Sequence, residues 1–438
     1  MYRILIFFVF VLTLFGFKLS ILGRTGDDSD NILSAIRIDD IVIMVFLISY
    51  TLKGGSWGYF FKQKPITIFI LYVLFCLFSA IYNSIFGQVA IGSSLLFALR
   101  PLEYFLYIAL GSELARLGYS LDRTFRVYII YCLLLIAGQT SGIIGGISNF
   151  SFSRAIANTG GPWELAGVSA FFLCYFFQER VIIYTLLSAA ILVLTQSRIT
   201  LVGSVFVLSF ANVQGMISLL KRKLTVLMSL VFIFSIILYA LYSNINGTTK
   251  NNTNSIDVTA RIEAFFSNET FLRLYDIYAN TDAAVSRNDY FEKTYGGSIT
   301  SIIGDVGEGD ASAYIRFTRW IMLIKTTNSD LVSFLIGLGP SYAAKAVDGN
   351  YVRFFAETGI VGLILYLLFL INVLMFIKNR TIRNYILILS ITAMFIDIFV
   401  THKAMFLFWL LYGYHLQTEK SSVNNKVKTD ENSLSHQS

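Results

Sequence analysis

Two arginines lie beside short polar turns in an otherwise apolar part of the chain. Arg154 comes shortly before Gly160-Gly161-Pro162-Trp163-Glu164, and Arg198 ends the turn Thr195-Gln196-Ser197-Arg198 between two apolar runs. A guanidinium stays charged and binds phosphate oxygens in pairs, which favours arginine at a phosphate or pyrophosphate. The alternative for either arginine is an anchor for lipid headgroups.

A second group of charged residues precedes the last apolar runs. Its segments are Arg316-Phe317-Thr318-Arg319-Trp320, then Gly337-Leu338-Gly339-Pro340, then the stretch from Asp348 through Arg353 and Glu357-Thr358-Gly359 to Gly362. A positioned carboxylate such as Asp348 can take a proton from an attacking hydroxyl. Clustered arginines stabilise the charge that develops on a leaving group. This set predicts group transfer without a metal ion or another cofactor.

Other ionisable residues have structural alternatives. Arg100 and Glu103 are three apart and share a helix face, so they can neutralise each other or a neighbouring helix in place of a substrate role. Asp397 and His402 could line the site or serve as structural partners. Asp27-Asp28-Ser29-Asp30 could bind a divalent cation, but a solvated acidic loop is the simpler interpretation.

The chain as a whole is too apolar for a water-soluble domain. Only 14% of its 438 residues are charged and 16% are aromatic, whereas soluble proteins carry about 25% charged residues. The mean hydropathy is +0.66. Intrinsic disorder and a disulfide scaffold are excluded as well, since Cys76, Cys132 and Cys174 all lie in apolar runs. The composition predicts an all-α, polytopic integral membrane protein.

A bilayer core about 30 Å thick needs roughly 20 helical residues per crossing. The apolar runs predict about twelve transmembrane helices. They are Ile4–Leu22, Ile38–Leu52, Pro65–Phe86, Ile91–Ala115, Val127–Ile147, Glu164–Phe177, Val181–Thr195, Ile199–Leu220, Leu224–Tyr242, Gly359–Ile377, Tyr385–Thr401 and Ala404–Leu416.

The distribution of positive charge predicts the orientation. With the N-terminus inside, the cytoplasmic segments hold seventeen Lys or Arg, whereas the short external loops hold five. Because cytoplasmic loops carry the excess of positive charge, both termini are expected in the cytoplasm. The net charge of +7 is thereby explained by topology, and no nucleic-acid partner is expected.

The predicted spans divide the chain into four parts. Residues 1–242 form a bundle of nine helices, 243–358 a large external (periplasmic) loop, 359–416 the last three helices, and 417–438 a polar cytoplasmic tail expected to be disordered. The loop has 116 residues.

Within this loop, apolar residues recur at helical spacing in Ala260–Tyr278 and in Tyr314–Lys325. This pattern predicts a small helical cap over the external mouth of the bundle.

The order of these motifs resembles the bacterial O-antigen polymerase and O-antigen ligase superfamily. The resemblance covers roughly Arg154 to Gly362. It rests on the Gly-Pro loop after Arg154, the Thr-x-Ser-Arg turn, the Gly-Leu-Gly-Pro loop, and the last motif, which enters a span at Glu-Thr-Gly. The N-terminal third is similar mainly in hydropathy.

This resemblance implies glycosyl transfer at the outer face of the bacterial plasma (inner) membrane. The donor would be a glycan on polyprenyl pyrophosphate, undecaprenyl in most bacteria. Arg198 matches the family's turn arginine and would hold the pyrophosphate leaving group, with Arg154 as its companion. In ligases the last motif begins with a His that activates the acceptor hydroxyl. Asp348 holds that position here and Gly349 replaces the usual Asn, which favours the polymerase branch.

Four further residues of the motifs are expected to bind the substrate. They are Arg316, Arg319, Arg353 and Glu357. Aromatic residues of the loop could hold sugar rings or pack within the cap. They are Tyr275, Tyr278, Tyr290, Tyr295, Tyr314 and Trp320.

The sequence thus predicts a polymerase that joins lipid-linked repeat units into an O-antigen or related surface polysaccharide. The expected partners are the undecaprenyl-pyrophosphate-linked oligosaccharide, membrane lipids, a chain-length regulator and a flippase. One alternative is a ligase that moves finished polymer onto a lipid core. Another is a flippase or transporter for the lipid-linked oligosaccharide, although transporters usually show repeat-related halves, which this sequence does not.

Overall fold

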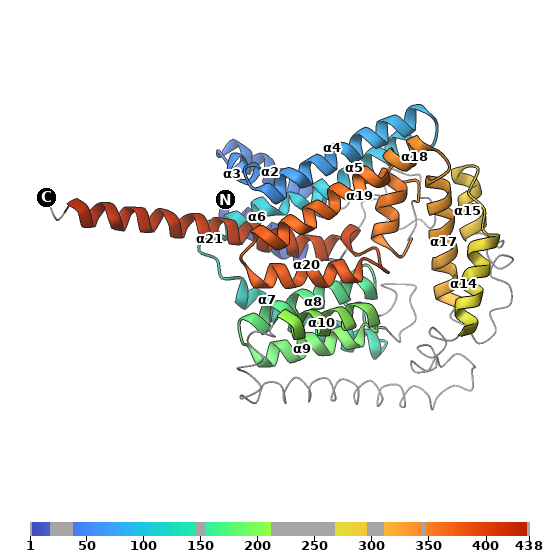
Figure 1. The fold of residues 1–438 in the computed structure, drawn as a ribbon. Coiled ribbons are helices and arrows are strands. Elements are labelled where there is room, and N and C mark those ends of the chain that lie inside the picture. Colours follow the sequence, from blue (N-terminus) through green and yellow to red (C-terminus); the bar gives the residue numbers. More distant parts are fainter. Residues whose placement is uncertain are drawn as a thin grey trace.

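The computed structural model describes residues 2–17, 38–144, 154–211, 268–295, 311–343 and 347–435 (Figure 1). Within these ranges the regular secondary structure is helical and contains no strand. The expected all-α fold class is therefore confirmed.

The helices described before residue 212 largely follow the predicted apolar runs. They are α1 (Tyr2–Phe15), α2 (Ile38–Leu52), α3 (Trp57–Phe61), α4 (Lys64–Ile85), α5 (Ile91–Phe105), α6 (Tyr107–Arg116), α7 (Leu121–Thr140), α8 (Pro162–Gln178), α9 (Ile182–Leu194) and α10 (Arg198–Ala211). The predicted span Ile91–Ala115 corresponds to α5 and α6 together. Their junction at Leu106 follows Pro101, which has no N–H to donate and so weakens the helix.

The helices described after residue 267 belong to the predicted cap and to the last part of the bundle. They are α14 (Asn268–Asn280), α15 (Arg287–Tyr295), α17 (Ala311–Thr327), α18 (Leu331–Ile336), α19 (Asn350–Phe376), α20 (Arg380–Thr392), the 3-10 helix η2 (Ile398–Val400) and α21 (His402–Ser435). The predicted helix Tyr314–Lys325 lies within α17.

Three helical units of the described chain are long and apolar enough to cross a membrane. They are α4, the α5–α6 pair over Ile91–Arg116, and α19. The apolar helices α1, α9 and α10 are shorter. These helices do not confirm the expected count of twelve spans, which stays a prediction, and the predicted span Leu224–Tyr242 lies outside the described residues.

Helix α21 packs closely along α6 in the middle of the bundle. A side chain at Gly111 would overlap the Leu410 carbonyl, and one at Gly413 would overlap the Ile108 carbonyl. Glycine at both positions therefore lets the two backbones approach, as small residues do between membrane helices.

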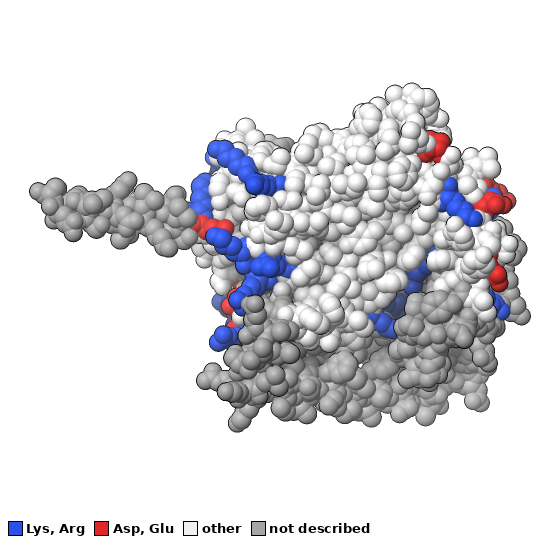
Figure 2. Space-filling view, viewed as in Figure 1, with Lys and Arg blue, Asp and Glu red and all other residues white. Residues whose placement is uncertain are grey.

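The two ends of the molecule differ. Helices α14, α15 and α17 stand together at one end, whereas the N-terminus and the projecting part of α21 lie at the opposite end (Figure 1). Figure 2 shows Lys and Arg gathered where α21 leaves the body, and a broad surface without charge between the ends. Exposed apolar side chains such as Leu71 and Phe78 on α4 and Ile371 on α19 are typical of a surface in contact with lipid.

Residues 417–435 of the predicted polar tail continue α21 as a helix. No Gly or Pro follows Gly413 to end the helix. His415 and Glu419, one turn apart, also approach to 3.5 Å between Nε2 and Oε1. The helix therefore projects beyond the bundle (Figure 1).

Candidate functional site

The turn that carries Arg198 is held by its own side chains. The Thr195 hydroxyl donates to the Leu192 carbonyl (2.6 Å) and accepts from the Ser197 amide (3.2 Å). Gln196 adopts a left-handed conformation with φ of 54°. The half-buried Arg198 begins α10, where the positive end of the helix dipole favours an anion.

Arg154 lies against the same turn. The Ala155 amide donates to the Leu194 carbonyl (3.0 Å), and Arg154 Nε donates to the Thr195 carbonyl (3.1 Å). The structure therefore brings Arg154 to the turn that ends in Arg198, with part of the Arg154 guanidinium engaged in holding the two segments together.

Asp348 pairs with Arg316 across a short loop. Arg316 Nε lies 3.3 Å from Asp348 Oδ2, and each of the two side chains is 34% exposed. Asp348 is in the left-handed region, with φ of 59°, which is uncommon outside glycine although Asp adopts it more readily than most residues. Such a residue is typical of a functional site.

The loop of Asp348 is held by the carboxylate of Asp397. It accepts the amides of Val347 (2.9 Å) and Asp348 (3.3 Å) through Oδ2 and the amide of Gly349 (3.2 Å) through Oδ1. Trp320 Nε1 also donates to the Val347 carbonyl (3.0 Å). Three successive amides thus converge on one anion, as they do in anion-binding nests.

The sequence left open whether Asp397 lines the site or has a structural role. It did not predict the clamp, which is the Asp397 carboxylate bound to the amides of Val347, Asp348 and Gly349. The one indication in the sequence was that an acidic residue in an apolar stretch is energetically costly. This identifies Asp397 as unusual but does not identify its partners.

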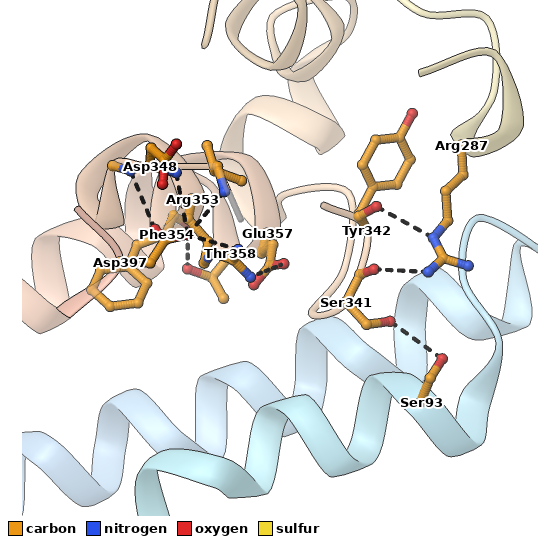
Figure 3. A network of polar contacts seen from close by, with 12 residues as sticks. Ser93, Arg287, Ser341, Tyr342, Asp348, Arg353, Phe354, Glu357, Thr358 and Asp397 are labelled. Atoms are coloured by element: carbon orange, nitrogen blue, oxygen red, sulfur yellow. Dashed lines mark hydrogen bonds and ion pairs between the residues drawn. The ribbon is translucent and has the colours of Figure 1, made fainter. Parts of the chain in front are cut away.

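Arg353 and Glu357 are buried beside this clamp. Arg353 Nη2 lies 2.9 Å from Asp397 Oδ2, and Arg353 Nη1 lies 3.6 Å from Glu357 Oε1. The side chain of Arg353 is 5% exposed, that of Asp397 12% and that of Glu357 9%. Figure 3 shows Asp348, Arg353 and Asp397 drawn together, with Glu357 beside them. Two carboxylates share one guanidinium, so Arg353 and Glu357 support the loop from inside. Their expected contact with substrate stays a prediction.

A break in α19 explains the Gly-Leu-Gly and Glu-Thr-Gly motifs. Gly359 leaves helical geometry with φ of 64°. The amides of Leu338 and Gly339 then donate to the carbonyls of Ala356 (2.7 Å) and Glu357 (3.1 Å). A Cβ at Gly337 or Gly359 would run into the facing backbone. Both glycines are therefore needed for two backbones to meet behind the site.

Arg319 lies on α17 and points toward α15 within the cap. Its guanidinium carbon lies 4.1 Å from the centre of the Tyr295 ring, and its Nε is 3.5 Å from the Thr294 carbonyl. Burial raises the pKa of Tyr295, so this phenol stays neutral beneath the guanidinium. Arg316 and Arg319 lie one turn apart on α17, and Arg316 is the one that meets Asp348.

The C-terminal end of α20 connects the two halves of the candidate site. Thr392 Oγ1 lies 3.5 Å from Thr200 Oγ1, two residues after Arg198. The next residue, Ala393, accepts the Asn350 amide (2.8 Å), two residues after Asp348. The predicted arginine turn and the predicted base are therefore both packed against one helix end.

Within the described ranges no three His, Cys, Asp or Glu side chains are grouped to hold a metal ion, and Asp27–Asp30 lies outside those ranges. The arrangement can offer a carboxylate and several guanidinium groups to a ligand. No family model, no curated protein and no solved structure matches this chain.

Proposed function

We propose that this protein is an O-antigen or surface-polysaccharide polymerase of the plasma membrane. It would transfer the growing glycan from polyprenyl pyrophosphate to the non-reducing end of the next lipid-linked repeat unit. The observation that supports the proposal is the geometry of Asp348. This carboxylate is partly exposed, held in a left-handed conformation and paired with Arg316.

Each residue has a role in this reaction. Asp348 accepts the proton of the attacking sugar hydroxyl, which makes it the general base. Arg198, with Arg154 beside its turn, binds the departing pyrophosphate, whose negative charge grows as the glycosidic bond breaks. Arg316 orients the Asp348 carboxylate. Arg319, Arg353 and Glu357 contribute to the binding region around the donor and acceptor.

The membrane location is part of the same proposal. An apolar surface separates a basic end, from which α21 projects, from the end formed by α14, α15 and α17 (Figure 2). In a multi-pass protein with cytoplasmic termini, this cap end faces outward, and the loop of Asp348 lies on the cap side. A lipid-linked donor could then place its pyrophosphate at the arginines while its polyprenyl chain stays in the bilayer. A flippase and a chain-length regulator would be its partners.

Two other functions compete with this one. A ligase would move finished polymer onto a lipid core with the same donor chemistry, but its acceptor-activating His is replaced here by Asp348. A flippase would need no general base, and therefore no strained, partly exposed carboxylate.

The test is the surface-glycan pattern of cells that carry Asp348→Asn at normal protein level. Loss of a positioned base costs about 10²–10⁴-fold in rate. A polymerase variant would still pass one repeat unit to the lipid core and give a single band in place of a ladder. A ligase variant would leave lipid-linked polymer without any transfer to the core. Asp276→Asn, on the exposed face of α14, is the control, and a normal ladder from Asp348→Asn would reject the proposed base.

A further inference from the structure

Helix α18 is a short helix of the cap whose apolar residues are turned outward. None of its six residues is buried. Its exposed large side chains are Leu331, Val332, Phe334 and Leu335, of which Leu331 is 71% exposed. A cap in water would be expected to bury such a run.

The depth of α18 follows from its contacts with α4. Ser79 Oγ donates to the Ile336 carbonyl (2.9 Å), and Asn83 Nδ2 donates to the Gly337 carbonyl (3.1 Å). Ser79 lies six residues before the end of α4 at Ile85, which is about 9 Å along the helix axis at 1.5 Å per residue. The C-terminal end of α18 therefore lies beside the last two turns of α4, on the bundle side of the end of that helix (Figure 1).

The surface at this depth is apolar. The exposed residues of α4 over this stretch include Phe78, Ile81 and Ile85, and α4 is one of the helices long and apolar enough to cross a membrane. Both α18 and this candidate span therefore expose apolar side chains near the place where Ser79 and Asn83 bond to the end of α18.

The other end of α18 returns to polar surroundings. The exposed residues Asn328, Ser329 and Asp330 precede it. Asp330 Oδ1 accepts the Ser333 amide (2.9 Å) and caps the helix. The polarity thus changes over one turn, from capping carboxylate to exposed leucine and phenylalanine, as at a boundary between water and lipid.

We propose that α18 is embedded in the lipid leaflet on the cap side, so that the cap enters the bilayer and does not merely stand above it. The occupant of the exposed face is bilayer lipid. A protein partner fits less well, because a stable interface buries about 800 Å² per partner and a six-residue helix with four apolar side chains offers only part of that.

This placement ties the membrane to the candidate site. Directly after α18, Gly337 packs against the break of α19 at Gly359, and Leu338 and Gly339 pair with the carbonyls of Ala356 and Glu357. The lipid anchor is therefore only a few residues from the backbone that supports Arg353 and Glu357.

The experiment places a spin label on the full-length protein in phosphatidylcholine–phosphatidylglycerol vesicles. Leu331→Cys and Leu335→Cys are each made in a chain whose three native cysteines, all buried, are replaced by alanine. Val285→Cys is the matched control, since Val285 lies in the cap and is 93% exposed. Collisions of the label are measured with oxygen, which concentrates in lipid, and with a nickel chelate, which stays in water.

Labels on α18 should collide more with oxygen than with the nickel chelate, and the label at Val285 should show the reverse order. Bimane at the same α18 positions should be quenched by lipids brominated on the acyl chain. A nickel-chelate preference at Leu335→Cys equal to that at Val285→Cys would overturn the proposal. An immobilised label that neither reagent reaches would also overturn it, because protein would then cover this face. Neither readout depends on glycan transfer, so the result is independent of the proposed function.

Discussion

Two turns of this molecule have a non-glycine residue in the left-handed conformation, one beside the predicted site residue Arg198 and one at the predicted site residue Asp348, and they are held in different ways. At the first turn, Gln196 has φ of 54°; at the second, Asp348 itself has φ of 59°. The first is stabilised mainly within a few residues, by the Thr195 hydroxyl and the Leu192 carbonyl, and Arg154 adds a bond to the Thr195 carbonyl. The second is stabilised by Asp397, which lies 49 residues beyond Asp348.

This difference indicates where each turn is vulnerable. A strained backbone conformation persists only when the surrounding contacts stabilise it by more than the strain destabilises it. Around Gln196, several hydrogen bonds, most of them local, share this task. Around Asp348, one carboxylate collects three amides and the Arg353 guanidinium, so we expect removal of this single side chain to loosen the loop.

The largest effect is expected from Asp397→Ala. This change leaves three amides and Arg353 without their shared acceptor, and breaking a buried ion pair typically costs about 3–5 kcal/mol in the free energy of unfolding. Glycan extension should fall as far as in Asp348→Asn, by about 10²–10⁴-fold, because the base is no longer held in place. Thermal unfolding in detergent and the surface-glycan ladder measure the two effects.

Asp397→Asn keeps one acceptor oxygen and should fall between the wild type and the alanine variant in both measurements. Asp276→Ala, on α14, is the exposed control. Full ladder length with Asp397→Ala would show that Asp348 needs no remote clamp.

A smaller effect is expected from Arg198→Lys. Lysine keeps the charge but cannot offer the paired donors of a guanidinium. A hydrogen bond to a charged group contributes about 1.5–3 kcal/mol, so polymer synthesis should drop roughly 10- to 100-fold at tenfold per 1.4 kcal/mol. The assay is incorporation of labelled repeat units into polymer by membranes.

The unfolding temperature of this variant should not change, unlike that of Asp397→Ala, because Arg198 is not the group that holds its turn. Arg123→Lys, exposed on α7, is the control and should behave as wild type. Equal activity of the two lysine variants would make Arg198 a headgroup anchor.

The difference between contacts within a few residues and contacts across long sequence separations also separates what the sequence could predict from what it could not. Apolar runs predicted the all-helical fold and the positions of α4, α9 and α19, because helical periodicity is a local property. Local spacing also predicted the turn before Arg198, and the structure places Arg154 against it.

Contacts across long separations were not predictable. The sequence identified Asp348 and Asp397 separately but gave no reason to join them. The close approach of the backbone at Gly337 to the break at Gly359 was visible in the sequence only as two glycine-containing motifs.

The smallest effect is expected from Thr195→Val, which tests the locally held turn. Valine has nearly the shape of threonine but removes the hydroxyl that donates to Leu192 and accepts from Ser197. Each lost hydrogen bond costs about 1 kcal/mol, so the free energy of unfolding should fall by about 1–2 kcal/mol, as measured by thermal unfolding in detergent. The glycan ladder should keep its length, because the remaining bonds of the turn, such as that from the Gln196 amide to the Val193 carbonyl (2.9 Å), still hold Arg198. Thr140→Val is the control, since that exposed hydroxyl only donates to carbonyls within α7 and surface changes stay within about 0.5 kcal/mol. If Thr195→Val were as damaging as Asp397→Ala, the local turn would depend on one side chain as heavily as the remote clamp does, and the distinction between the two would fail.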